Sequence, residues 1–171
     1  MDDKQLHEEE INNLIHKIVD QITNETLQDD ELSLSIKETM NIWEWESGVA
    51  LFALYLFYRK TKDNTILNFI INWFESRMNN VPAKNVNTMC PLLTLSFVYE
   101  ETGVEIYLHL CKEWLEYAMK QMPRTEEAGI QHIVVNKRNE GQLWDDTLYM
   151  TVLFICRMGI ILKEDRYIQE S

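Results

Sequence analysis

The chain matches itself when it is displaced by 41 residues, and this internal repeat constrains its fold more than any other feature. Seven pairs of identical residues share that spacing, namely Leu54 and Leu95, Tyr58 and Tyr99, Thr61 and Thr102, Leu67 and Leu108, Trp73 and Trp114, Glu75 and Glu116, and Met78 and Met119. In both copies a densely apolar segment is followed by a short polar turn and then by an amphipathic segment. That order is typical of an αα-hairpin with a buried first helix and a half-buried second helix. The repeat therefore predicts an all-α fold of stacked αα-hairpins.

The same pattern places the helices within a single domain, residues 1–171. Buried inner helices are expected at Ser47–Thr61, Thr88–Thr102 and Thr147–Leu162, and amphipathic outer helices at Asn64–Met78 and Glu105–Met122. Residues 1–35 are expected to form an acidic N-terminal helix, Asp2–Asn24, and a polar connector, Thr26–Ser35. A third outer helix would open at Arg166, where the sequence is about to end. The chain is thus expected to be about half of a larger array of hairpins.

Composition narrows the class of partner. Lys and Arg total 16 and Asp and Glu total 28, so the net charge is −12. This sign argues against nucleic acid and anionic membranes as partners, because phosphate groups attract positive surfaces. The sequence has no apolar run long enough to cross a membrane and no N-terminal signal peptide, which predicts a cytoplasmic protein. The three cysteines show no C-x-x-C spacing, so no disulfide framework and no metal or cofactor is expected.

Polar residues recur where the inner helices begin. The pairs Glu46-Ser47, Asn87-Thr88 and Asp146-Thr147 occupy equivalent positions, where Ser or Thr can cap free N–H groups. Equivalent helix ends of stacked hairpins lie on one face, so a common rim is expected from Trp43, Trp45, Glu46, Asn85, Asn87, Trp144, Asp145 and Asp146. Taken singly, each polar residue can be a helix cap and each indole can be core packing. Together, indoles, amides and carboxylates on one rim are typical of a sugar-binding site.

Several segments of this chain also resemble a known enzyme family. They are Trp43-Glu-Trp-Glu-Ser-Gly-Val-Ala50, Asn87-Thr-Met-Cys-Pro-Leu-Leu-Thr-Leu95, Tyr99-Glu-Glu-Thr-Gly103, Pro123-Arg-Thr-Glu-Glu127, Gln131-His-Ile133 and Gln142-Leu-Trp-Asp-Asp-Thr-Leu-Tyr-Met150. These segments are similar to the unsaturated rhamnogalacturonyl hydrolases and the related unsaturated glucuronyl hydrolases, glycoside hydrolase families 105 and 88. The resemblance implies an (α/α)6 barrel of six hairpins, of which this chain would supply the N-terminal half.

The resemblance also implies a reaction and a set of residues. The family's substrates are pectin-derived oligosaccharides that carry a 4,5-unsaturated uronic acid at the non-reducing end. By this resemblance Asp146 protonates the double bond and activates the water that adds beside it. Burial beside Trp144 would favour the protonated carboxyl, whereas the helix N-terminus would favour the anion, and the sequence leaves that balance open. Substrate-binding roles are implied or expected for Trp144, His132, Trp45, Asn87 and Asp145.

Asp145 is expected to cap the helix or orient its neighbour, because it lies about 100° round the helix from Asp146. An alternative reading is a helical-repeat binding module or a non-catalytic remnant, since a period of 41 is close to that of HEAT and armadillo repeats. Half a barrel would also leave apolar inner helices exposed. The chain is therefore expected to self-associate through Thr147–Leu162 and the open edge of the first hairpin, to bind a partner that completes the barrel, or to be poorly stable. It is also expected to have little or no activity alone.

Overall fold

The fold is all-α, as predicted, in the residues that the computed structural model describes, 3–23, 31–134 and 138–170. Its helices are α1 (Asp3–Thr23), α2 (Glu31–Met40), α3 (Trp45–Thr61), α4 (Asn64–Glu75), α5 (Val86–Thr102), α6 (Glu105–Lys120), α7 (Asp145–Thr147), α8 (Leu153–Leu162) and α9 (Asp165–Glu170). A short 3-10 turn, η1 (Met78–Asn80), follows α4, and a π-helical turn, η2 (Leu148–Val152), joins α7 to α8. The described ranges contain no β-strand, only an isolated bridge between Arg124 and Ile130.

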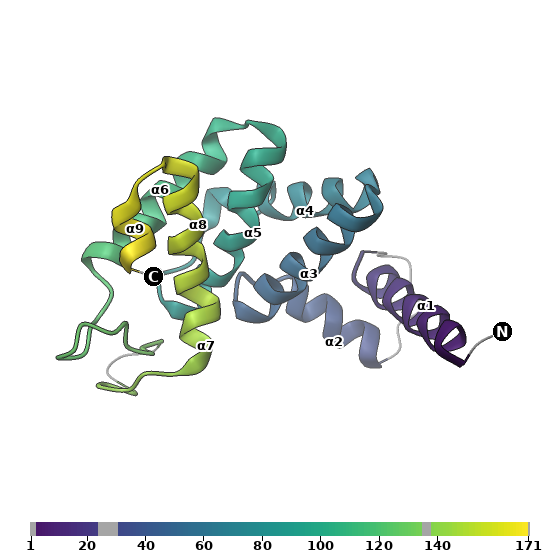
Figure 1. Cartoon of the computed structure of the whole chain (residues 1–171), viewed down its shortest axis with the longest axis horizontal. Coiled ribbons are helices and arrows are strands. Elements are labelled where there is room, and N and C mark those ends of the chain that lie inside the picture. The colour runs from purple at the N-terminus through teal and green to yellow at the C-terminus, as the bar shows by residue number, and fades with distance from the viewer. Residues whose placement is uncertain (1–2, 24–30, 135–137, 171) are drawn as a thin grey trace.

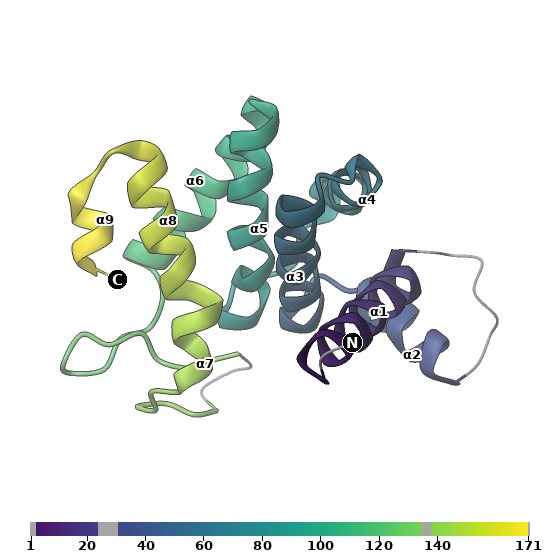
Figure 2. The same ribbon diagram turned by 45° about the vertical axis from the view of Figure 1, so that its right-hand side comes forward.

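Three hairpins make up most of the molecule (Figure 1). The inner helices α3, α5 and α8 stand side by side, and each begins near the lower end of the view in Figure 2. Helices α4, α6 and α9 each pack on the inner helix that precedes them. Helices α1 and α2 lie beside α3, at the far side from α8 (Figure 2). The three inner helices therefore bring their N-terminal ends to one end of the stack, as the repeat predicts.

The ends of the inner helices repeat as closely as the sequence does. Helices α3 and α5 both begin with a capping box, formed by Glu44 with Ser47 and by Asn85 with Thr88. Both members of the second pair lie 41 residues beyond those of the first. The inner helices also end alike, since Lys62, Gly103 and Lys163 all adopt the left-handed conformation, with φ of 59°, 67° and 57°. Helices α3 and α5 thus share one local design at both ends, and all three inner helices share it at the C-terminal end.

A tryptophan cluster forms the centre of the first two hairpins. Trp43 lies 5.4 Å from the ring of Trp73 and 6.3 Å from that of Trp114, and these last two are partners in the sequence repeat. The indole N–H of Trp43 donates to the carbonyl of Thr88 at 2.8 Å. Trp43 is 5% exposed, so the expectation that it lies on the polar rim is wrong. It is a core residue because its one polar atom finds a backbone acceptor inside the protein.

The N-terminal segment differs from its prediction. Helix α1 agrees with the expected first helix to within a residue or two, and residues 24–30 of the predicted connector lie outside the described ranges. Residues 31–35 are not a connector, because they open α2. The segment is polar enough to be read as a loop, yet Ile36 and Met40 bury one side of the helix. An amphipathic helix needs only a narrow apolar stripe, and this one was too short to recognise.

The third inner helix is continuous but not regular. The amide of Leu153 donates to the carbonyl of Leu148, which is the i→i+5 bond of a π-helix. The prediction of one uniform helix over Thr147–Leu162 is corrected accordingly. A π-turn adds one residue to a helical turn, and nothing in an evenly apolar run marks where that residue goes. The extra residue lies directly after the three residues of α7, Asp145–Thr147.

Helices α3 and α5 approach closely at Gly48. A methyl group at Gly48 would lie 2.6 Å from Sγ of Cys90, 2.8 Å from its Cβ and 2.8 Å from the backbone nitrogen of Pro91. That nitrogen carries no hydrogen, because proline has no N–H, and so it leaves room for the facing helix. Glycine on α3 and proline on α5 together allow the two helices to approach this closely.

We expect Gly48→Ala to destabilise the chain by about 1–3 kcal/mol through overpacking. In an unconstrained helix the same change would stabilise by up to about 1 kcal/mol, so the sign of the effect tests the close approach. Urea unfolding followed by circular dichroism measures it. Gly103→Ala is the matched control: no atom lies within 4 Å of its added methyl group, and only its positive φ of 67° opposes the change. Its cost should be about 1 kcal/mol. A Gly48→Ala chain as stable as the unsubstituted protein would contradict the packing argument.

Candidate active site

The third inner helix begins differently from the other two. In α3 and α5 the hydroxyls of Ser47 and Thr88 accept from the backbone N–H of Glu44 and Asn85, at 3.2 and 2.9 Å. Thr147 occupies the equivalent position in α7, but its hydroxyl lies 3.0 Å from Nδ1 of His132. The helix is preceded by Trp144, which makes no side-chain cap. The group that caps two helices is thus directed at an imidazole in the third.

His132 is held on several sides in a buried position. Its ring lies flat on the indole of Trp144, with centroids 4.3 Å apart and planes 7° from parallel. Its Nδ1 also lies 3.1 Å from Oδ1 of Asp146, and the residue is only 5% exposed. The family resemblance implies that His132 lies near the substrate. In the structure His132 lies against Asp146 and Trp144. A solvent-exposed loop histidine, the other reading of its sequence, does not fit this burial.

Asp146 has two unlike oxygens. Its side chain is 40% exposed, but Oδ1 is buried and makes no hydrogen bond of good geometry within the described residues. A buried carboxylate oxygen without a donor is costly, because it has left water and gained no partner. Such an oxygen is suited to carry a proton or to receive a donor from a bound molecule. Asp146 therefore has one oxygen that water can reach and one buried oxygen whose neighbour is Nδ1 of His132, 3.1 Å away.

A long loop between α6 and α7 delivers His132. The backbone N–H of His132 donates to the carbonyl of Gln142 at 3.0 Å, and the indole N–H of Trp144 donates to the Gln142 side chain at 2.9 Å. The neighbouring Gln131 donates to the carbonyl of Arg124 and accepts from the N–H of Gly141. Two glutamines thus tie the loop to itself and to the start of α7. The other two hairpins have no insertion of this length, so only the third can bring a histidine to its helix.

A second polar group lies at the starts of α3 and α5. The side chain of Asn87 hydrogen-bonds to that of Glu44, and Glu44 is half-buried. Burial raises the pKa of the Glu44 carboxyl, the N–H of Trp45 and the Asn87 amide lower it, and the nearby charge of Glu46 raises it further. Asn87 therefore has the rim position expected for it. Glu44 was not among the residues predicted from the sequence, although its place in a capping box, 41 residues before Asn85, could have indicated it.

Tyr149 and Cys90 are two buried titratable residues near the starts of the inner helices. It follows Asp146 by three residues, and burial raises the pKa of its hydroxyl to about 12, with Cys90 as a further cause. Cys90 in turn is buried beneath Glu46 and Glu44, and burial followed by these two charges raises its pKa to about 12. The ring of Tyr149 packs edge-on against Phe52 of α3. The polar rim thus rests on an aromatic and thiol layer that has no ionised group near neutral pH.

The remaining predicted residues divide between two sides of this end. Trp45 and Trp144 are 40% and 45% exposed, so both present indole faces that a ligand can reach. Asp145 does not join His132. It lies with Trp144, Leu148 and Arg124 around a cavity of about 470 Å³ between the α6–α7 loop and α9. The two adjacent aspartates therefore face different surroundings, which agrees with the turn of about 100° between them.

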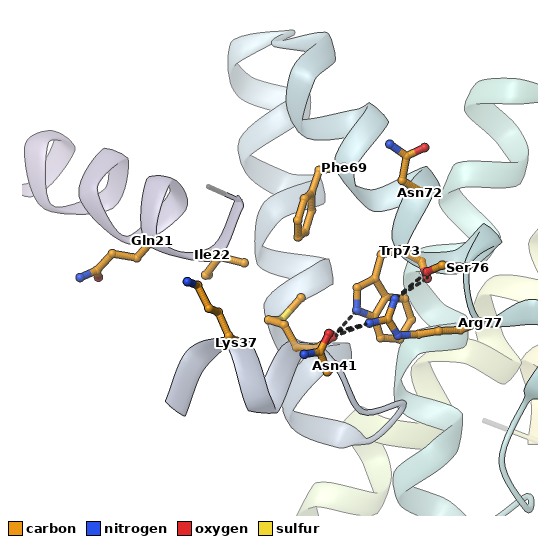
Figure 3. Close-up of a pocket in the computed structure, with 10 residues that line it drawn as sticks. Gln21, Ile22, Lys37, Asn41, Phe69, Asn72, Trp73, Ser76 and Arg77 are labelled. Carbon is orange, nitrogen blue, oxygen red and sulfur yellow. Dashed lines mark hydrogen bonds between the residues drawn. The ribbon is translucent and has the colours of Figure 1, made fainter. Parts of the chain in front are cut away.

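Another cavity, of about 520 Å³, lies between α1, α2 and α4 (Figure 3). Arg77 is its main cation, but its guanidinium already donates to the carbonyls of Trp73 and Met40 and to Ser76 and Asn41. The Cζ atom of Arg77 lies 4.5 Å from the centre of the Trp73 ring, and burial lowers the pKa of Arg77. These bonds tie the end of α4 to the end of α2. We therefore assign Arg77 a structural role. The candidate active site is at the end of the stack that carries Asp146.

Two further features bear on the class of site. Within the part of the chain that the structure describes, no three His, Cys, Asp or Glu side chains lie close enough to hold a metal ion. Among the same residues, no helix combines the length and apolarity needed to span a membrane. The residues at this end comprise the Asp146 carboxyl, the stacked imidazole of His132, the exposed indoles of Trp45 and Trp144, the pair of Asn87 with Glu44, which was not predicted, and Asp145 on the other side.

Comparison with known proteins bears on the family and the fold. The chain is 27% identical, over 160 residues, to the unsaturated rhamnogalacturonyl hydrolase YesR of Bacillus subtilis (strain 168), covering 92% of this chain and 44% of that protein. A crystal structure described as a possible member of the GH105 family, from Klebsiella pneumoniae, superposes with a TM-score of 0.80 at 35% identity, covering 95% of this chain and 45% of the other. A second such structure, from Salmonella enterica serovar Paratyphi A, gives a TM-score of 0.78 at 36% identity and covers 91% and 44%.

These relatives settle the fold expected from the resemblance, and the chain spans somewhat less than half the length of each. The sequence profile described as Glycosyl Hydrolase Family 88 matches residues 14–171, which is most of the chain and includes all the site residues described above. The chain belongs to Glycosyl Hydrolase Family 88.

Proposed function

We propose that this chain carries the catalytic acid of a hydrolase for oligosaccharides that end in a 4,5-unsaturated uronic acid. The observation that carries the proposal is Asp146 Oδ1, a buried oxygen without a protein donor beside a stacked histidine and an exposed indole. Membership of a glycosyl hydrolase family supports it, as does the name of the relative from Bacillus subtilis. That name also makes an unsaturated rhamnogalacturonan fragment the first substrate to test.

The proposed reaction needs one carboxyl group in two states. Asp146 as the acid gives its proton to C4 of the C4=C5 double bond, which leaves positive charge shared by C5 and the ring oxygen. The resulting carboxylate then takes a proton from water as the water oxygen bonds to C5. The hemiketal so formed opens, the ring is lost and the remaining sugar is released. Asp146 ends the cycle protonated, so no covalent enzyme intermediate is required, unlike the usual retaining glycosidase route.

The surrounding residues have separate roles in this proposal. Trp144 and Trp45 present indole faces on which a sugar ring can stack and bury its apolar face. His132 stands against Asp146, and Asn87 with Glu44 offers an amide and a carboxyl for sugar hydroxyls. Asp145 is proposed to hold the start of α7 in place without touching the reacting atoms.

Turnover is to be measured on the chain together with whatever completes the barrel, because the chain spans less than half of its relatives. In that preparation Asp146→Asn should abolish turnover, because an amide N–H is far too weak an acid to protonate C4. A general acid contributes about 10²–10⁴-fold to rate, and the loss should be at least that large. The loss of absorbance of the C4=C5 bond reports turnover directly. Asp145→Asn is the matched control, and we expect it to retain activity within about ten-fold, since a helix-terminal charge contributes only about 0.3–1 kcal/mol. Full activity in Asp146→Asn would remove the catalytic assignment.

Glu44 gives a test of the second polar group that needs no substrate. An acid whose pKa is raised by folding binds more protons in the folded state, so stability falls as pH rises through the window above the ordinary value of 4.5. Glu44→Gln removes that loss and keeps a hydrogen-bonding side chain. The substituted chain should therefore gain stability relative to the original as pH rises from about 4 to 7. Chemical unfolding at several pH values measures the difference, and parallel curves would contradict the burial of this carboxyl.

We further propose that self-association covers exposed apolar residues of the third hairpin. Leu148, Leu153 and Ile160, in η2 and α8, are 59%, 45% and 55% exposed. Apolar surface of this extent commonly marks an interaction site. Sedimentation velocity of the chain should show a dimer or larger species, and the double substitution Leu153→Glu and Ile160→Lys should shift it toward monomer. The exposed pair Glu126→Gln and Lys60→Gln serves as the control. A monomer at all concentrations would leave this surface to a different partner.

A further inference from the structure

The environment of Thr147 assigns a role to a residue that only packing would otherwise explain. In the first two hairpins the equivalent hydroxyl makes two bonds that matter here, and it also lies 2.9 Å (Ser47) or 3.3 Å (Thr88) from the carbonyl three residues before it, that of Glu44 or Asn85. It accepts from the N–H three residues before it and donates to the carbonyl five residues before it, Ile42 for Ser47 at 2.7 Å and Ala83 for Thr88 at 2.9 Å. Both bonds belong to the helix cap. In α3 and α5 the hydroxyl at this position therefore makes its hydrogen bonds within the start of its own helix.

His132 takes over both places in the third hairpin. The carbonyl five residues before Thr147 is that of Gln142, and it accepts the backbone N–H of His132 at 3.0 Å. The Thr147 hydroxyl then lies 3.0 Å from Nδ1 of the same histidine and makes no other hydrogen bond among the described residues. The inserted loop thus replaces the cap with one residue, His132. The backbone N–H of His132 donates to the carbonyl of Gln142, and the His132 imidazole contacts the hydroxyl of Thr147.

This exchange bears on which nitrogen of His132 carries the proton. A hydroxyl proton needs an acceptor, and Nδ1 is the one that Thr147 has within reach. Donation from Thr147 to Nδ1 leaves that nitrogen without a hydrogen and places the ring proton on Nε2. The ring does not direct Nδ1 at Asp146, since Oδ1 is 3.1 Å from Nδ1 yet makes no hydrogen bond of good geometry. The Thr147 hydroxyl is therefore the hydrogen-bonding partner of Nδ1.

We propose that Thr147 is a positioning residue that holds His132 in the Nε2–H tautomer. This role rests on the proposed function for its catalytic meaning, because Asp146 must deliver its proton to the substrate. An imidazole that donated from Nδ1 to Asp146 would stabilise the carboxylate and oppose that delivery. Thr147 occupies Nδ1 and prevents this, and it leaves Nε2–H as the group that His132 can offer to a bound sugar. Stacking against Trp144 holds the plane of the His132 ring in this orientation.

The test is the tautomer itself, read from the ring nitrogens of the ¹⁵N-labelled chain by long-range proton–nitrogen correlation. The chain has four histidines, and a His132→Gln variant assigns the signals of His132. We expect Nδ1 of His132 to be unprotonated at neutral pH in the unsubstituted chain. Thr147→Val should move the ring toward the Nδ1–H form, and Thr147→Ser should restore the original pattern. Serine is a sound rescue because Ser47 already occupies the same position in the first hairpin.

Thr88→Val is the matched control, since it removes the equivalent hydroxyl of α5 and leaves His132 untouched. It should lower stability without changing the His132 signals. An Nδ1–H tautomer in the unsubstituted chain would overturn the proposal even if no variant folds. So would a Thr147→Val chain with unchanged signals, or a Thr88→Val chain with an equal shift.

Turnover gives an independent reading. Thr147→Val should lose on the order of 10²-fold, as a misplaced catalytic group does, and Thr147→Ser should recover most of it. If Asp146→Asn keeps full turnover, the proposed reaction fails, and the nitrogen signals still decide the role of Thr147. If the tautomer is as expected and Thr147→Val turns over normally, Thr147 fixes the ring without serving the reaction, and the catalytic part of this inference is wrong.

Discussion

The first turn of each inner helix has N–H groups that must find partners, and the rest of this end of the molecule is arranged around how they do so. Two helices solve the problem with a capping box, and the positions of Ser47 and Thr88 are then fixed for structural reasons. Because the three helices start at one end of the stack, their first turns bring polar groups together there. The residue one place before Ser47, Thr88 or Thr147, which is Glu46, Asn87 or Asp146, stands at that same end. The place of the proposed site is thus a consequence of repeating the hairpin.

The third hairpin departs from the repeat at the residues of the proposed site. The third hairpin carries a long loop before its inner helix, and the loop supplies His132 and the two glutamines that fix it. It also gives up the side-chain cap, since Trp144 stands where Glu44 and Asn85 stand in the others. A π-turn follows at once, so the helix is irregular at its mouth as well. Irregularities of this kind are common at functional sites, and here they gather around Asp146.

The parts of the structure that the sequence could predict are those that repeat. The spacing of 41 residues predicts the inner helices α3 and α5 to within two residues at either end, because their caps and turns recur as well as their apolar residues. Trp43 could not be placed in this way, since its burial depends on Trp73 and Trp114 and on a carbonyl of α5. Helix α2 was missed because its apolar stripe is brief. The rim position of Glu44 was also missed, because an acidic residue before a helix has many ordinary explanations.

The relation between Asp145 and Asp146 shows how far helical geometry alone can decide function. Both residues lie in the same three-residue helix, and the sequence makes them chemically equal. One turns toward a cavity beside Arg124, and the other turns toward His132. The difference arises because Thr147, next in the chain, must face the protein interior, where it is 4% exposed. Once its hydroxyl meets His132, the preceding residue is placed within 3.1 Å of the same nitrogen, and the one before that is carried to the other side. The burial of a threonine is therefore the structural reason for proposing Asp146, and not Asp145, as the residue that reacts.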